Sequence, residues 1–179
     1  EEGDMYSFDV IDDNGCTHTI SGGPFVATPV ANAGLDDDVC SFSYDLNANP
    51  SLGVGTWTAT GPSVALFSNT NDNSPTATAT VAAAGPYVLT WTEDNGGCTD
   101  SQDITVQFSN VGYTDAVVQS TCGNSDGEIE LTGNNGIAPY QYSIDGGATF
   151  TNTTGNFTGL AAATYDVVVQ DNLGCVVSG

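Results

Sequence analysis

The chain contains no lysine and no arginine, and this absence limits both its internal interactions and its partners. Its 179 residues include 22 Asp and Glu and a single His, which gives a formal net charge of −22. No carboxylate can therefore form a salt bridge with Lys or Arg anywhere in the fold. The chain also lacks the cationic side chains that neutralise phosphates, which excludes a nucleic-acid partner. An anionic membrane surface would repel it.

The rest of the composition favours strands over helices. Apolar residues make up 39 % and there are 22 Gly, whereas charged residues are only 12 %, about half the usual share. Thr and Val are abundant, and they are typical strand residues. No apolar run approaches the roughly 18 residues of a membrane span, and no signal peptide is recognisable. We therefore expect an all-β piece of a longer protein, without direct membrane insertion.

One pattern occurs three times: an alternating strand that begins at Tyr, an acidic turn with Gly, and then Cys. The copies span 6–16, 87–98 and 165–175. The first and third have the same length and are offset by 159 residues, which indicates one module type. The second is one residue longer and indicates a related type. The sequence thus predicts the C-terminal tail of a truncated module at 1–22, a complete module at 27–108 and another at 109–179.

Within the two complete modules, short alternating segments separated by turn residues predict tandem immunoglobulin-like β-sandwiches. Asn-Gly or Asp-Gly turn signals begin at Asn14, Asn95, Asn135 and Asp145. The expected strands of the middle module lie near 39–46, 54–59, 64–68, 76–82, 86–92 and 102–108. Those of the last module lie near 115–121, 127–132, 139–145, 155–159 and 164–170.

The five cysteines suggest one disulfide within each complete module. Cys40 and Cys98 lie near the first and penultimate strands of the middle module, and Cys122 and Cys175 occupy similar places in the last. We predict these two pairs, and a partner outside the segment for Cys16. A disulfide that closes a loop of this length stabilises the folded state by roughly 4 kcal/mol in the chain-entropy model. Disulfides indicate an oxidising compartment. No CxxC pair supports zinc as the alternative.

The last module carries a distinctive series of motifs. They are Cys122-Gly-Asn-Ser-Asp126-Gly127, Ala138-Pro139-Tyr140-Gln-Tyr142, Asp145-Gly146-Gly, Phe157-Thr-Gly159-Leu160, and Tyr165 followed by Asp171 and Gly174-Cys175. In combination they resemble the SprB repeat, a module of very large Bacteroidetes cell-surface proteins that include gliding-motility adhesins. Ala163 departs from the Gly that the family usually has before Thr-Tyr.

The middle module resembles the immunoglobulin-like or PKD-like domains that accompany such repeats. The residues that carry this likeness are Ala31-Asn-Ala-Gly34, Val39-Cys40, Gly55-Thr-Trp57, Ala84-Gly85-Pro-Tyr87 and Trp91. The two resemblances together imply export by type IX secretion, an extracellular or cell-surface location, and an adhesive or structural function.

Catalysis has few candidate groups in this sequence. The one His, His18, lies two residues after Cys16, so a Cys–His pair is conceivable. However, we predict that Cys16 is disulfide-bonded, as at the equivalent position of the module, and no Lys or Arg is present to stabilise a thiolate. No pair of acids stands out for hydrolysis. We expect a protein that is not an enzyme and that requires no certain cofactor.

Calcium is the main hypothesis for a bound ion, because clustered Asp and Asn oxygens are the ligands that Ca²⁺ prefers. The best candidates are Asp36, Asp37 and Asp38, which lie at a module junction where a cation would stiffen the joint. Further clusters lie at 12–14 and 93–95. The alternative is that these residues serve turn geometry and solubility.

Aromatic residues suggest a second kind of site. Trp57, Trp91, Tyr140 and Tyr142 could stack on a sugar ring, and surface glycans would then be partners. The alternative is core packing, since both Trp residues lie in apolar phase on predicted strands.

These observations predict a rigid stalk: a structural or adhesive repeat segment of a giant bacterial surface protein or extracellular fibre. Its partners would be neighbouring repeats of the same chain or fibre. Two alternatives remain open at this point, a glycan-binding module of a secreted protein and a strand-donating subunit of a polymeric fibre.

Overall fold

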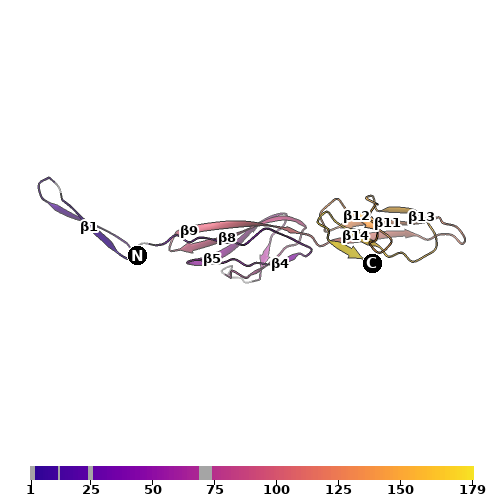
Figure 1. The fold of residues 1–179 in the computed structure, drawn as a ribbon, viewed down its shortest axis with the longest axis horizontal. Helices are drawn as coiled ribbons and strands as arrows, with labels where there is room; N and C mark the ends of the chain where they lie inside the picture. Colours follow the sequence, from indigo (N-terminus) through magenta and orange to yellow (C-terminus); the bar gives the residue numbers. More distant parts are fainter. Residues whose placement is uncertain (1–2, 12, 24–25, 69–73) are drawn as a thin grey trace.

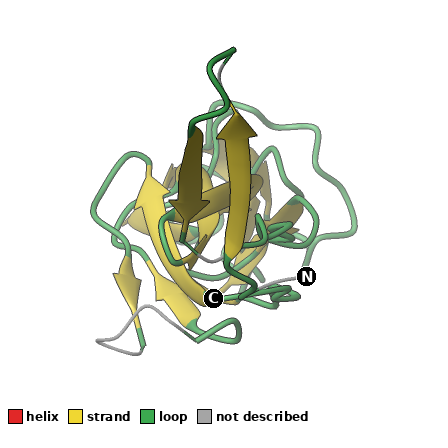
Figure 2. Cartoon of the chain, turned by 90° about the vertical axis from the view of Figure 1, so that its left-hand side faces the viewer, coloured by secondary structure: helices red, strands yellow, loops and turns green. Residues whose placement is uncertain are grey.

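A computed structural model describes residues 3–11, 13–23, 26–68 and 74–179, and all of its regular elements are strands. Along the chain come a hairpin, a first sandwich and a second sandwich, in line along the long axis in Figure 1. Figure 2, a view along that axis, shows strands and loops only. Within the described ranges no helix is present, and hence none that could cross a membrane. The predicted all-β class is confirmed.

The N-terminal hairpin consists of β1 (Tyr6–Ile11) and β2 (Thr17–Gly22). The two strands are antiparallel and form a two-stranded sheet, in a register that runs from Tyr6 opposite Gly22 to Ile11 opposite Thr17. Every described residue of β1 is exposed.

The middle sandwich packs a four-stranded sheet against a three-stranded one. The larger sheet has the order β3 (Asp37–Val39), β9 (Cys98–Phe108), β8 (Gly85–Asn95) and β5 (Val54–Thr60). The smaller sheet has the order β4 (Ser43–Asp45), β7 (Thr78–Thr80) and β6 (Leu66–Phe67). Pairing is antiparallel except between β3 and β9, which run parallel. The core includes Trp57, Trp91, Tyr87, Leu89, Val106 and Phe108.

The last sandwich is built from two three-stranded antiparallel sheets. One has the order β10 (Gly112–Val118), β11 (Gly127–Asn134) and β13 (Asn156–Leu160). The other has the order β12 (Gln141–Ser143), β14 (Val168–Gln170) and β15 (Val176–Ser178). The buried core consists of Val111, Ile129, Leu131, Tyr142, Val169 and Cys175.

The predicted turns are only partly those of the structure. The turn after Asn95 closes the hairpin β8–β9 through Gly96 and Gly97, whose positive φ values of 62° and 95° suit glycine. The Asn135 turn joins strands of different sheets instead of a hairpin, because β11 pairs with β10 and β13. The short strands β3 and β15 were not predicted.

The turn at Asp145 is held by its own carboxylate. Asp145 accepts hydrogen bonds from the Ser143 hydroxyl at 2.5 Å, from the Thr149 amide at 3.0 Å and from the Thr149 hydroxyl at 2.7 Å. These bonds lower the pKa of Asp145 from 3.8 to about 2. Its contribution to stability is therefore complete above pH 3.8 and is lost as the pH falls through about 2.

A buried carboxylate lies at one end of the middle core. Alternation along β8 directs Tyr87, Leu89, Trp91 and Glu93 to the inner face. The Glu93 side chain is fully buried. It accepts hydrogen bonds from the Trp91 indole nitrogen at 2.8 Å, the Ser51 hydroxyl at 2.6 Å, the Ser51 amide at 3.0 Å and the Leu52 amide at 3.1 Å.

These hydrogen bonds replace the salt bridge that the sequence cannot supply. Burial by itself would raise the pKa of Glu93, but the bonds from Ser51, Trp91 and Leu52 outweigh that effect and lower it below 4.5. Glu93 therefore stabilises the folded state above its ordinary pKa, and this contribution is lost as the pH falls through the lower folded-state pKa.

We expect Glu93→Gln to destabilise the middle sandwich by about 1–3 kcal/mol, because a neutral amide cannot accept all of these bonds. Urea unfolding followed by Trp fluorescence measures this sandwich, since both Trp residues lie in it. The variant should also lose less stability than the wild type on acidification below pH 4.5. Asp38→Asn, an exposed change of equal charge, is the matched control. Equal unfolding midpoints for Glu93→Gln and wild type would contradict the assignment.

Candidate functional site: the joint between the two sandwiches

The two sandwiches meet where strands β3 and β9 end side by side. The parallel register places Val39 opposite Phe108. The Ser109 amide then donates to the Val39 carbonyl at 2.9 Å, and Ser109 is fully buried. Cys40 follows Val39 directly. Two segments that are far apart in sequence therefore lie side by side at this end of the middle sandwich, one continuing into β4 and the other into the last sandwich.

A disulfide joins this point to the last sandwich. Cys40 is bonded to Cys175, with 5.4 Å between their Cα atoms and 135 residues between them in sequence. Cys175 is only 3 % exposed and lies in the loop between β14 and β15. The bond therefore crosses from one sandwich to the other.

The predicted pairs Cys40–Cys98 and Cys122–Cys175 are wrong, and strand geometry explains why. Cys98 begins β9 and the joint lies at its other end, so about 3.3 Å per residue over β9 puts roughly 30 Å between Cys98 and the joint. A disulfide needs Cα atoms within about 7 Å. Cys122 follows β10, which starts at the joint and runs away from it. Neither Cys98 nor Cys122 is in a disulfide.

A buried carboxylate, Asp171, holds the same joint from the other side. One oxygen accepts the Ser109 hydroxyl at 2.5 Å and the Ile137 amide at 3.0 Å. The other accepts the Leu173 amide at 3.0 Å and the Cys175 amide at 2.9 Å. Asp171 is 4 % exposed. Its four neutral donors tie the end of β9 to the loop that carries the disulfide.

Few residues separate the two cores. Phe108 belongs to the middle core and Val111 to the last one. Between them, Ser109 is bonded to Asp171, and the Asn110 amide donates to the Asn135 carbonyl at 3.0 Å. The connection therefore has no unattached stretch in which the sandwiches could turn relative to each other.

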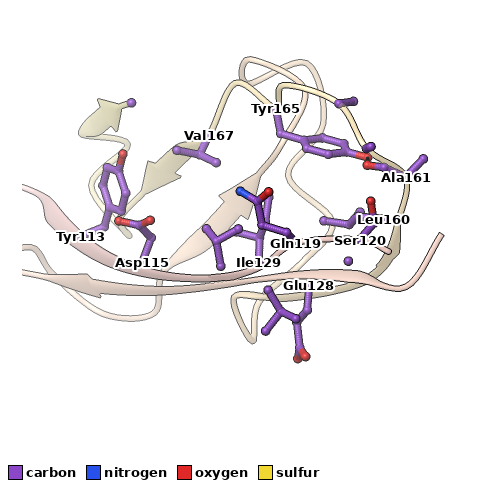
Figure 3. A pocket seen from close by; sticks show the side chains of 16 residues that line it. Tyr113, Asp115, Gln119, Ser120, Glu128, Ile129, Leu160, Ala161, Tyr165 and Val167 are labelled. Carbon is purple, nitrogen blue, oxygen red and sulfur yellow. Dashed lines mark hydrogen bonds between the residues drawn. The ribbon is translucent and has the colours of Figure 1, made fainter. Parts of the chain in front are cut away.

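A second feature is a groove of about 400 Å³ between the two sheets of the last sandwich. Figure 3 shows Ile129, Leu160, Tyr165 and Val167 around it, and the Glu128 carboxylate pointing away. Val117 and Val118, which also line it, are 56 % and 58 % exposed. The groove is thus an apolar surface at the edge of the sandwich.

The predicted aromatic platform is not formed, because its rings pack inside two different cores. Trp57 and Trp91 are each 1 % exposed and lie against each other with ring centroids 5.2 Å apart. Tyr142 is 7 % exposed, and its hydroxyl accepts the Gly133 amide at 3.2 Å. Tyr140 is half-buried, and its hydroxyl donates to the Gly136 carbonyl at 3.0 Å. These residues pack in or against the cores, which was the alternative to sugar stacking.

The calcium candidates Asp36, Asp37 and Asp38 line a shallow groove with Thr105 and Gln107. Asp36 accepts the Thr105 amide at 2.7 Å, and Asp37 accepts the Asp38 amide at 2.9 Å. Burial, and secondarily the Asp37 carboxylate, raise the pKa of Tyr44.

Among the described residues, no group of three His, Cys, Asp or Glu side chains is arranged to hold a metal ion. Of the other predicted clusters, Asp12 lies outside the described residues and Glu93 is occupied by Ser51, Leu52 and Trp91. Calcium binding at Asp36–Asp38 stays a prediction.

From the sequence we named Asp171 only as a motif residue and did not predict that Asp171 or Ser109 holds the joint, although the repeats contain a signal for Asp171. Asp171 precedes Cys175 by four residues, and Asp12 precedes Cys16 by the same spacing. An acid at a fixed distance before a cysteine, repeated in both copies, indicates a shared structural function. Nothing in the sequence distinguishes Ser109 from the other serines.

Comparison with known families supports the reading of the last sandwich. Residues 114–149 match the SprB repeat, a stretch that includes most of β10, strands β11 and β12, and the Asp145 turn. The resemblance of this module to the SprB repeat is confirmed. A search of curated protein sequences found no match.

Comparison with solved structures gives distant matches to multi-domain chains. A variant of titin domains I67–I69 is 12 % identical, with a TM-score of 0.45, and the match covers 97 % of this chain and 71 % of that one. The eight N-terminal Ig domains of the Down syndrome cell adhesion molecule are 9 % identical with a TM-score of 0.48, covering 98 % and 34 %. Cadherin domains 1–4 of protocadherin gamma B7 are 11 % identical with a TM-score of 0.39, covering 90 % and 53 %.

We expect Asp171→Asn to destabilise the last sandwich by about 1–3 kcal/mol, because the amide presents two donors where the joint needs acceptors. Hydrogen exchange should show faster exchange of the Leu173 and Cys175 amides. Asp166→Asn, an exposed acid of the same sandwich, is the control. Unchanged protection of both amides would show that Asp171 does not organise the joint.

Proposed function

We propose that this chain is a stiff structural segment of a large extracellular bacterial protein, of adhesive or fibre type, and not an enzyme. The observation that carries this proposal is the joint. A disulfide, a fully bonded buried carboxylate and a two-residue connection fix one sandwich to the next. Domains in one chain move relative to each other unless their interface prevents it, and this interface is cross-linked.

The surface chemistry supports an exposed location. A disulfide persists in an oxidising compartment, and the SprB-repeat match at 114–149 agrees with a surface protein. With no Lys or Arg, the chain gives trypsin-like proteases no cleavage site. A charge of −22 would keep neighbouring segments apart in solution. Export by type IX secretion and a connection to gliding motility belong to the same proposal.

Adhesion by such a segment would depend on number rather than on one strong site. Many segments in series multiply weak contacts into a tight attachment, provided that they engage together. Stiff joints favour this, because they hold the segments at fixed spacing. The apolar groove of the last sandwich is the surface available for such a contact. Glycan binding by the four predicted aromatic residues is not supported by their burial.

We expect the double variant Cys40→Ser/Cys175→Ser to separate the motions of the two sandwiches while leaving both folded, because each has its own core. Nuclear relaxation of backbone nitrogens measures this directly. In the wild type both sandwiches should tumble with one correlation time, and in the variant each should show a shorter one.

The double variant Cys98→Ser/Cys122→Ser is the matched control, since it also removes two sulfurs but not the cross-link. It should tumble like the wild type. Independent tumbling of the two sandwiches in the oxidised wild type would overturn the stiff-segment proposal.

Calcium would add to this stiffness if Asp36, Asp37 and Asp38 bind it. The same relaxation measurement with calcium and then with chelator tests that proposal. Shift changes confined to the Asp36–Asp38 groove would support a site there, and identical spectra would leave a stiff segment without calcium.

A further inference from the structure

The N-terminal hairpin carries an apolar face that is exposed in the described part of the chain. Tyr6, Phe8 and Val10 of β1 and Ile20 of β2 are 42 %, 54 %, 46 % and 42 % exposed. The register places Phe8 opposite Ile20, and the Tyr6 and Phe8 rings stack with centroids 6.5 Å apart. These four residues are in the same alternation phase and share one face.

The opposite face of the hairpin is mainly polar. Asp9 and Thr19 are paired across the strands, and the Thr19 hydroxyl donates to the Asp9 carboxylate at 2.6 Å. Ser7 and Ser21 are paired on the same side. The hairpin thus has the inner and outer faces of a sheet that belongs to a sandwich. A two-stranded hairpin alone is marginally stable, so this apolar face needs a cover.

The hairpin β14–β15 of the last sandwich has the same register, 159 residues further on. Each of the three pairs of β14–β15 has its counterpart in β1–β2. Both loops contain a glycine of positive φ at the residue before Cys, 82° at Gly15 and 86° at Gly174. The matched pairs are Asp9–Thr19 with Val168–Ser178, Val10–His18 with Val169–Val177, and Ile11–Thr17 with Gln170–Val176.

The correspondence continues beyond the assigned strands of the last sandwich. Phe8 pairs with Ile20 in the first hairpin. The equivalent residues, Val167 and Gly179, exchange two backbone hydrogen bonds of 3.2 and 3.1 Å. The hairpin of the middle copy of the pattern, β8–β9, differs, because a two-residue turn joins its strands and its Cys lies in β9. The likeness is therefore specific to the first and last hairpins.

In the last sandwich the equivalent face is covered. Val169, the counterpart of Val10, is fully buried, and Val167 and Val177 pack against the same core. The cover is the sheet β10–β11–β13, whose Ile129, Leu131 and Phe157 belong to this core. This sheet shows which surface fits a hairpin of this register.

We propose that the apolar face of β1–β2 docks on a three-stranded antiparallel sheet of the β10–β11–β13 kind, as the closing hairpin of a further SprB-type sandwich. The partner is thus a sheet with apolar inner residues in the places of Ile129, Leu131 and Phe157. It is not the last sandwich of a second copy, since β14 and β15 already cover that sheet. This inference stands whether or not the joint is stiff.

The test is a graft within the full chain: residues 165–179 are replaced by residues 6–20, which have the same length and register. If the hairpin is equivalent, the last sandwich keeps its fold. Hydrogen exchange should then show β11 protected as in the wild type, and peptide mapping should show a disulfide between Cys40 and the grafted cysteine. A grafted chain in which β11 loses its protection would overturn the proposal.

Two neighbouring substitutions within the graft separate docking from general tolerance. The grafted Val10 takes the place of Val169, which is fully buried, and the grafted Ile11 takes the place of Gln170. Val10→Ser should lower the melting temperature of the grafted sandwich and reduce protection of β11, whereas Ile11→Ser should do neither. Equal effects of the two substitutions would contradict a face-specific contact.

The unmodified chain provides an independent test of the occupant. Light scattering after size exclusion should give a monomer in which the amides of β1 and β2 exchange rapidly. A dimer that protects these amides would mean that a second copy covers the face, and would overturn the proposal.

Discussion

The hydrogen bonding of buried carboxylates without any cationic side chain is the constraint on which the rest of this structure depends. Glu93 and Asp171 are both buried, and each accepts hydrogen bonds from four donor groups, which are amides, hydroxyls or an indole. An unpaired buried charge would be very costly. Loop amides and hydroxyls therefore have to lie within hydrogen-bonding distance of each carboxylate. The two acids consequently fix the conformation of these loops.

At Asp171 this requirement has a consequence beyond one sandwich. Its donors include Ser109 at the end of β9 and Cys175, which is bonded to Cys40. The hydrogen bonds and the disulfide thus hold the same loop from two segments at one end of the middle sandwich, the end of β9 and the residue after β3. Both link the middle sandwich to this loop of the last one. The stiff segment and the docking of the first hairpin that we propose would both suit a repeating array.

Particular elements show how far the sequence reached. The sequence predicted the alternation of β8, the glycine turn that follows it and the SprB-type motifs of the last module. These features depend on residues that are neighbours in the chain. The parallel strand β3 was not, since three residues carry no distinct period. The Trp residues were correctly placed on strands, but burial against each other was one of two open possibilities. The cysteine pairing failed because similar positions in sequence lie at opposite ends of long strands.

By itself, the sequence determined the all-β class, the repeated hairpin, the charge and the absence of salt bridges to Lys or Arg, because composition and local periodicity fix these properties. Only the tertiary structure decided that Cys40 is bonded to Cys175, that Asp171 accepts hydrogen bonds from three segments, and that an apolar face of the first hairpin is exposed. The physical reason is that these features depend on where strands end in space. That position is set by the packing of whole sheets rather than by any run of neighbouring residues.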